Sequence, residues 1–428
     1  MSLLELDFSN YPIVGQSDAF EESMQRAQDA ERRLRRADVE GRDFLGWMTL
    51  PTDMQGAELD RMKATADHLR KECDAVLMFG IGGSYLGAAA LIEALPEQVS
   101  GPEIYFVGNS LCSDYLYNVL QKLEGRRVGV VVISKSGTTL EPAVALRIFM
   151  RYYEQARGVA LEPSHVVAIT DAHRGALHDM AEAHGWARYV VPDNVGGRYS
   201  VLSAVGLLPL LIAGVDVDAL LRGAQKAQEE FLSAPLESSL PARYASARYY
   251  QYQLGHRVEV MVGYSPYLRG LLEWCKQLFA ESEGKLGRGI FPTSAIFTTD
   301  LHSLGQYFQE GHRFFFATHM QFRQVQHDLR VPSDADNRDG LNYLAARTVH
   351  ELNLVAQEAT QQAHLEGGLP SLTLWIGARR CSDLGYLIYF LEYSCALSCI
   401  CQAVPPFNQP GVEAYKGHMF SRLGRPAK

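Results

Sequence analysis

The sequence has few long uninterrupted apolar segments. Its longest, Val201 to Gly214, has about fourteen residues and contains Pro209, whereas a membrane-spanning helix needs about 20. We interpret this segment as a buried core helix. The opening residues, MSLLELDFSN, also lack the basic flank and apolar core of a secretory signal, so we expect a cytoplasmic location.

The sequence also lacks an excess of basic residues. Lysine and arginine total 40 against 49 acidic residues, which gives a formal net charge of -9. A chain without a broad positive field is poorly suited to nucleic acid or an anionic membrane, so we expect neither as a partner. An anionic substrate would have to be bound by local donor groups.

Cysteine is scarce, with seven scattered residues in the chain. An odd number without regular spacing argues against the disulfide framework of small secreted domains. The one cluster, Cys395, Cys399 and Cys401, lies in an apolar segment without a nearby histidine. We interpret these cysteines as buried small side chains and expect no metal site there.

Short β-branched or aromatic segments alternate with helical segments in the first half of the chain. These predicted strands end at Gly80, Gly108, Ser134, Thr170 and Pro192. Continuous apolar segments of this length, separated by helices such as 85–95 and 141–156, are typical of parallel strands covered on both faces. The pattern predicts an open, doubly wound parallel sheet in an α/β fold.

A second region of the same kind follows a polar helical segment at 216–240. Its predicted strands are 258–264, 313–320 and 371–377, and its predicted helices are 268–281, 341–364 and 384–403. We expect a long polar loop at 331–340 and see no residue-level repeat between the halves.

The length of the chain predicts more than one domain. With 428 residues it is too long for one ordinary hydrophobic core. We expect an N-terminal arm at 1–62, a first α/β domain at 63–215, a second at 216–403 and a C-terminal helical arm at 404–428.

A glycine-rich turn, Gly80 to Gly87, follows the first predicted strand and begins a helix. Glycines let the backbone approach an anion closely, and free N–H groups at a helix start attract negative charge. A dinucleotide site is disfavoured, because the third glycine of its motif would fall on Tyr85. The turn indicates either an anion site or a purely structural tight turn.

A second turn, Ser134 to Thr139, reads SKSGTT and follows another very apolar strand. Its four hydroxyl side chains and the incoming helix supply donors suited to a phosphate monoester. No glycine precedes the lysine, so the turn is not a P-loop; the alternative is a helix-capping cluster. If the two strands are neighbours, both turns lie at the carboxyl edge of the sheet, where open sheets bind ligands.

Several side chains outside these turns could take part in chemistry. Gln277 and Glu281 are four residues apart, so a helix places both on one face, and the carboxylate is a candidate general base. The alternative for Glu281 is a solvated residue near a helix end. Taken singly, Arg198, His302 and Lys416 fit structural or solvated roles as well as catalytic ones.

Six segments of the chain form an ordered set that extends from residue 80 to residue 416. They are GIGGSYLG, SKSGTT, DNVGGRYSVLSAVGL, QLFAESEGK, TTDLHSLGQ and FNQPGVEAYK. In residue identity and in order, these six segments resemble those of the phosphoglucose isomerase family in its compact bacterial form. One departure is Ala280, where the family has glycine before the glutamate; it leaves the carboxylate in place.

The resemblance implies two sugar-isomerase (SIS-type) α/β/α sandwich domains, a homodimer, and neither a metal nor an organic cofactor. It implies the isomerisation of glucose 6-phosphate to fructose 6-phosphate through a cis-enediolate. The phosphate site would consist of Gly83, Ser84, Ser134, Lys135, Ser136, Gly137, Thr138 and Thr139.

The same resemblance assigns the remaining roles. Glu281 would shuttle the proton, and Arg198 would stabilise the enediolate. His302 and Lys416 would open the sugar ring, with the histidine donated by the neighbouring subunit. Gln277 would contact the substrate.

Three other functions fit parts of this pattern. A related isomerase acting on mannose 6-phosphate or an amino sugar would share the phosphate site. A non-catalytic sugar-phosphate sensor would need the SKSGTT turn but would have no use for Glu281, Arg198, His302 and Lys416 together. A dehydrogenase function is disfavoured because the dinucleotide-binding motif lacks its third glycine.

Overall fold

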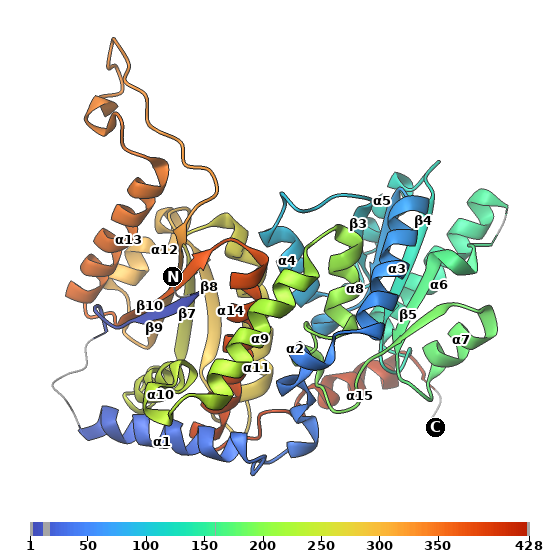
Figure 1. Cartoon of the computed structure of the whole chain (residues 1–428), viewed down its shortest axis with the longest axis horizontal. Coiled ribbons are helices and arrows are strands. Elements are labelled where there is room, and N and C mark those ends of the chain that lie inside the picture. The colour runs from blue at the N-terminus through green and yellow to red at the C-terminus, as the bar shows by residue number, and fades with distance from the viewer. Residues whose placement is uncertain (1–2, 12–17, 159, 426–428) are drawn as a thin grey trace.

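The chain contains two five-stranded sheets that lie side by side (Figure 1). The computed structural model describes residues 3–11, 18–158 and 160–425. The first sheet has the order β3-β2-β4-β5-β6 and is parallel throughout. Its strands are β2 (Ala75–Phe79), β3 (Glu103–Val107), β4 (Val128–Ile133), β5 (Val166–Thr170) and β6 (Ala187–Val190). The five strands predicted for the first half are confirmed.

Helices cover both faces of the first sheet. Alternate residues of each strand point to opposite faces, so Met78 packs with one set of helices and Leu77 with another. One face is covered by α3 (Ala57–Glu72), α4 (Leu86–Ala94) and α8 (Ala204–Ala213). The other is covered by α5 (Ser113–Lys122), α6 (Leu140–Arg157) and α7 (Ala176–His184). The predicted doubly wound architecture is confirmed, and α8 is the buried core helix expected from the longest apolar segment.

The second sheet has the order β1-β10-β9-β7-β8. Its strands are β7 (Val258–Gly263), β8 (Phe291–Ile296), β9 (Phe315–Gln324), β10 (Ser371–Ala378) and β1 (Leu4–Asp7). The predicted parallel arrangement holds for β7, β8, β9 and β10, and the edge strand β1 is added antiparallel to β10. Neither β1 nor β8 is predicted from the sequence: β1 has four residues, and β8 reads FPTSAI, with a proline and two hydroxyl residues.

The two sheets share one topology despite the absence of a sequence repeat. In each half the second strand along the chain, β3 or β8, lies on one side of the first strand, β2 or β7. The third and fourth strands lie on the other side of that first strand. The connection from the first strand to the second therefore runs in the opposite direction across the sheet from the connection between the third strand and the fourth. In the first sheet this topological switch point lies between β2 and β4, where an open α/β sheet binds its ligand.

The remaining helices belong mostly to the second half. They are α1 (Asp18–Arg35), α2 (Leu50–Asp53), α9 (Val217–Ser233), α10 (Leu240–Gln253), α11 (Arg269–Glu283), α12 (Leu301–Glu310), α13 (Val349–Glu366), α14 (Cys381–Cys401) and α15 (Val412–Arg422). The helix predicted from residue 341 begins only at Val349, because Thr348 and Glu351 form a capping box there. Residues 325–348 instead form an exposed arm that projects from the molecule (Figure 1).

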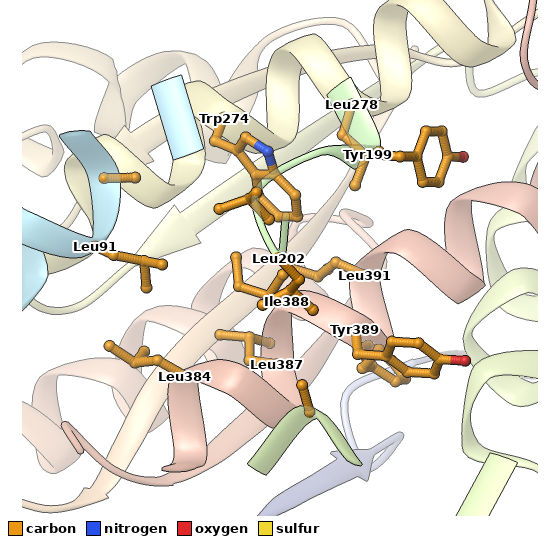
Figure 2. Close-up of a cluster of buried hydrophobic side chains, with 14 of the residues drawn as sticks. Leu91, Tyr199, Leu202, Trp274, Leu278, Leu384, Leu387, Ile388, Tyr389 and Leu391 are labelled. Carbon is orange, nitrogen blue, oxygen red and sulfur yellow. The ribbon is translucent and has the colours of Figure 1, made fainter. Parts of the chain in front are cut away.

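Helix α14 joins the two halves through a shared core. Its 21 residues are long and apolar enough to span a membrane, with a mean hydropathy of 1.5, but 94% of that window is buried inside the protein. Figure 2 shows its side chains packed against residues of other elements, among them Leu91, Leu202, Trp274 and Leu278. The three clustered cysteines lie on α14 as free, buried thiols, so the prediction that they are buried is confirmed.

Two histidines are buried between the second sheet and α13. His319 on β9 is fully buried, and neither ring nitrogen has a hydrogen-bond partner among the described residues. His364 on α13 is 3% exposed. Burial lowers the pKa of His319 to about 3, with a smaller contribution from His364, and burial together with the nearby Arg313 lowers the pKa of His364 to about 4. Both rings are therefore neutral at pH 7.

We expect the protein to lose stability as the pH falls from 6.5 toward 4. The unfolded chain binds protons on both histidines near pH 6.5, whereas the folded protein binds them only near their lowered pKa values. Each such proton lowers the free energy of unfolding by about 1.4 kcal/mol per pH unit. Urea unfolding at pH 7 and pH 5 measures this loss, which His364→Gln should reduce by about half. An unchanged pH dependence in that variant would contradict the assignment.

Candidate functional site

The two turns singled out in the sequence meet at the switch point of the first sheet. Strands β2 and β4 are parallel neighbours, with Phe79 opposite Val132 near their carboxyl ends. The first turn forms a short 3₁₀ helix, η2 (Gly82–Ser84), and the second leads directly into α6. The prediction that both turns lie at one edge of the sheet is confirmed.

A cavity of about 450 Å³ lies at this edge. The turns contribute one wall, and η4 (Gly197–Tyr199), the end of α11 and helix α15 contribute the others. The predicted site residues that line it are Gly83, Ser84, Ser136, Thr138, Thr139, Arg198, Gln277, Glu281 and Lys416. Segments more than 330 residues apart in the chain, such as the turn at Gly83 and Lys416 on α15, therefore meet around one space the size of a small ligand.

Helix α11 directs two polar side chains into the cavity. Gln277 and Glu281 lie one turn apart on the same face, and the Gln277 amide donates a 3.0 Å hydrogen bond to the Glu281 carboxylate. That carboxylate also lies 3.5 Å from the Arg198 guanidinium. Its side chain is 30% exposed, so one part is held by protein donors while another faces the cavity. Ala280 lies within the regular helix, so the departure from glycine there does not disturb the backbone.

Arg198 is the most heavily bonded side chain of the site. Its guanidinium is 2% exposed and donates to the Ser282 hydroxyl at 2.6 Å and to the Pro406 carbonyl at 2.6 Å. A third bond, at 3.3 Å, goes to the side-chain oxygen of Gln409. Five rigid donors in a planar fork suit this role. The result is a fixed positive charge at the wall of the cavity.

The loop before α15 is held by cationic side chains. Besides Arg198, the Lys285 ammonium donates to the Pro405 carbonyl, and burial lowers the pKa of that lysine to about 8. This loop places Gln409 and Lys416 at the cavity. Gln409 is a lining residue that the sequence reasoning missed, although it lies inside the segment FNQPGVEAYK, which contained the only signal for it.

Gly83 is required where two backbone segments approach each other. A Cβ atom at this position would lie 2.1 Å from the carbonyl oxygen of Gly197. A clash with backbone cannot be relieved by side-chain rotation, so η2 would have to move away from η4. The glycine therefore brings the first turn next to Arg198.

Replacing Gly83 with alanine should raise the KM for the sugar phosphate implied by the family resemblance at least about tenfold. The displaced turn would no longer hold its donor groups at the wall of the cavity. Gly196→Ala is the matched control, since a Cβ atom at Gly196 would meet nothing within 4 Å. Steady-state kinetics of both variants measure the difference. Equal KM values in the two would show that the contact between η2 and η4 has no part in binding.

Three residues of the SKSGTT turn do not line this cavity. The Ser134 hydroxyl accepts a 3.1 Å hydrogen bond from the Gly137 amide, so both residues shape the turn from within. Gly137 has a φ of 71°, a conformation that favours glycine. The Lys135 side chain forms a 2.7 Å ion pair with Asp193.

His302 is also absent from the lining of the cavity. It is the second residue of α12, and its side chain is exposed. Within one subunit the structure therefore brings Glu281, Arg198 and Lys416 together without the histidine.

The cavity is lined by groups other than a metal-binding cluster. In the described part of the chain no group of three or more histidine, cysteine, aspartate or glutamate side chains is arranged to hold an ion. The cavity instead offers hydroxyl, amide, ammonium, guanidinium and carboxylate groups. Such a set can bind an anionic ligand and move a proton.

Comparison with known sequences gives consistent results. A family model described as phosphoglucose isomerase matches residues 59–357. The chain is 46% identical over 390 residues to the glucose-6-phosphate isomerase of Staphylococcus epidermidis, covering 90% of this chain and 88% of that protein. It is 43% identical over 430 residues to the glucose-6-phosphate isomerase of Staphylococcus aureus strain Newman, covering 100% and 97%.

Comparison with solved structures extends the similarity to the fold. A hypothetical protein from Thermus thermophilus superposes with a TM-score of 0.88 at 32% identity, covering 98% of this chain and 99% of that one. A glucose-6-phosphate isomerase from Chlamydia trachomatis superposes with a TM-score of 0.83 at 20% identity, covering 99% and 88%. At that identity the second match establishes a shared fold only.

Proposed function

Because the chain belongs to the phosphoglucose isomerase family, we propose that it interconverts glucose 6-phosphate and fructose 6-phosphate, a step of glycolysis and gluconeogenesis. One observation carries the mechanism: a carboxylate, a buried arginine and a hydroxyl-rich turn share one cavity. The enzyme would act in the cytoplasm, where hexose phosphates are metabolised, and without a metal or organic cofactor.

The hydroxyl-rich turn binds the phosphoryl end of the sugar in this proposal. Ser136, Thr138 and Thr139 face the cavity together with Ser84 of the first turn. Hydroxyl groups and backbone amides at helix starts are suited to a phosphate monoester. The phosphate takes no part in the chemistry, but fixing it orients C1 and C2 toward the base, and such orientation can contribute about 7–11 kcal/mol.

Lys416 and a histidine open the ring. The ring oxygen must gain a proton while the anomeric hydroxyl loses one, so two groups of opposite role are needed. Lys416 lines the cavity and is held by Glu413 at 2.8 Å. We assign the second group to His302 of a neighbouring subunit, since in its own subunit His302 is exposed and outside the lining.

Glu281 then transfers a proton between the two carbons. Its carboxylate takes the proton from C2 of the open aldehyde and returns it to C1 from the same face, through a cis-enediolate. General-base catalysis contributes about 10²–10⁴-fold. Arg198 lies 3.5 Å from this carboxylate, so its charge is beside the developing oxyanion, where such a group is worth about 3–4 kcal/mol.

A homodimer would complete the site. The arm at 325–348 projects from the molecule (Figure 1) and carries Leu329 and Tyr343, which are 73% and 75% exposed. Large apolar side chains on a projecting segment suit a protein interface. The arm follows the carboxyl end of β9, and His302 follows the carboxyl end of β8 in the same parallel part of the sheet, so a second copy covering this edge would also meet His302.

The test is a coupled assay of fructose 6-phosphate conversion, with glucose 6-phosphate detected by its dehydrogenase, run with and without a chelator. We expect equal turnover in both. No turnover would refute the proposed reaction, and loss of turnover with chelator would refute metal independence. NMR assays with mannose 6-phosphate and amino-sugar phosphates separate the related isomerases, and proton exchange at C2 separates an enzyme from a sensor.

A further inference from the structure

Helix α11 presents two different faces near its end. The face toward the cavity carries Gln277 and Glu281, whereas the opposite face carries Phe279 and Glu283, which are both fully buried. These two pairs have the same spacing of four residues, so each occupies one stripe of the helix. Any contact that fixes the buried stripe also fixes the rotation of the stripe with the proposed base.

Arg248 of α10 contacts both residues of the buried stripe, Phe279 and Glu283. Its guanidinium lies 4.3 Å from the ring centroid of Phe279 and forms a two-pronged ion pair with Glu283, in which Nη2 donates to Oε2 at 3.3 Å. The Arg248 side chain is completely buried. One side chain therefore holds α11 over a full turn directly behind Glu281.

Arg248 is itself held rigidly by the second sheet. Its Nε donates a 2.8 Å hydrogen bond to Glu259 on β7, whose carboxylate also accepts from Tyr244 and Thr318, each at 2.6 Å. Glu283 in turn accepts a 3.3 Å bond from the Ile290 amide. The network thus connects α10, β7, β9 and the end of α11 through charged hydrogen bonds.

Stability alone does not account for this network. Removing an arginine and two carboxylates from water is costly, and apolar side chains of similar volume often stabilise a core as well or better. A planar guanidinium, in contrast, fixes the direction of its partners, because its donors form a rigid fork. The network therefore specifies the orientation of the helix end, where a displacement of about 1 Å can cost about 10²-fold in rate.

We infer that Arg248 and Glu283 are positioning residues for the isomerisation, holding the last turn of α11 so that the Glu281 carboxylate faces both C1 and C2 of the open sugar. Arg198 holds the same turn from the cavity side through Glu281 and Ser282. Three consecutive residues are thus clamped between two arginines. This inference rests on the proposed function.

The fate of the proton taken from C2 reports directly on the position of the Glu281 carboxylate. The carboxylate takes a proton from C2, and the same proton either returns to C1 or exchanges with water before it returns. A carboxylate held over both carbons returns it quickly, whereas a displaced one gives water more time to exchange. With glucose 6-phosphate deuterated at C2, the deuterium retained at C1 of the product measures this partition.

The experiment compares Arg248→Lys and Glu283→Gln with the wild-type enzyme. We expect kcat to fall about 10–100-fold with KM within about threefold, and the retained deuterium to fall at least about twofold in both variants. Arg379→Lys is the matched control: Arg379 is 8% exposed and also forms a two-pronged pair, with Glu97, away from the cavity lining. It should lower the melting temperature without changing the retention.

Unchanged deuterium retention in either folded variant would overturn the inference, as would an equal loss of retention in Arg379→Lys. If Arg248→Lys does not fold, Glu283→Gln decides alone, because an amide of the same size keeps the packing of the helix end. A wild-type enzyme without isomerase activity would refute the proposed function instead. The two failures are therefore distinguishable.

Discussion

Replacing Glu281 with glutamine should lower kcat by about 10²–10⁴-fold, while the KM for the sugar phosphate stays within about threefold. The amide has the size of the carboxylate; its oxygen can accept from Arg198 and its NH₂ group can donate to the side-chain oxygen of Gln277, so the shape of the cavity is kept. It cannot accept a proton from C2, so the step between the open aldehyde and the enediolate stops. Steady-state kinetics in both directions measure the effect.

A matched control for this variant lies on the same helix. Glu273→Gln changes a half-exposed carboxylate that pairs with Lys276 and does not line the cavity. Its kcat should equal that of the wild type. Normal turnover in Glu281→Gln would refute the base assignment, and an equal loss in Glu273→Gln would point to a general effect of charge on α11.

An equal mixture of inactive Glu281→Gln and His302→Ala chains should regain about a quarter of the wild-type activity after subunit exchange. About half of the dimers would then be mixed, and each mixed dimer would contain one site with both native residues. The physical reason is that Glu281 faces the cavity within its own subunit, whereas His302 does not. Activity measured before and after exchange, with exchange followed by a tag on one chain, gives the result.

The control mixture combines Glu281→Gln with Lys416→Ala. Both residues line the same cavity of one subunit, so no mixed dimer would contain a complete site. This mixture should stay inactive. Recovery in the control, or no recovery in the first mixture despite confirmed exchange, would contradict the shared site.

Much of the site could be predicted because its signals are local. An apolar strand followed by glycines or hydroxyl residues is visible in a short window, and both such turns lie where the sequence places them. The spacing of Gln277 and Glu281 likewise follows from the period of a helix. The resemblance to a known family added the roles of these residues, which spacing alone left open.

Errors in the prediction arose where local signals are weak. Strand β1 has four residues, and strand β8 contains Pro292, so neither resembles a typical buried strand. The sequence likewise did not show that the Lys135 side chain forms an ion pair with Asp193 and does not line the cavity. The direction of a side chain in a turn depends on what packs around it, and a short window does not contain that information.

By itself, the sequence determined most of the strands and helices, the parallel arrangement of the strands it identified and the chemical groups available, because apolar periodicity and turn residues act over a few positions. Only the tertiary structure decided that Glu281, Arg198 and Lys416 share one cavity, and that Arg248 holds the helix behind the base. These contacts join segments that are distant in the chain. They depend on how two sheets and their helices pack as a whole, which no local pattern of residues specifies.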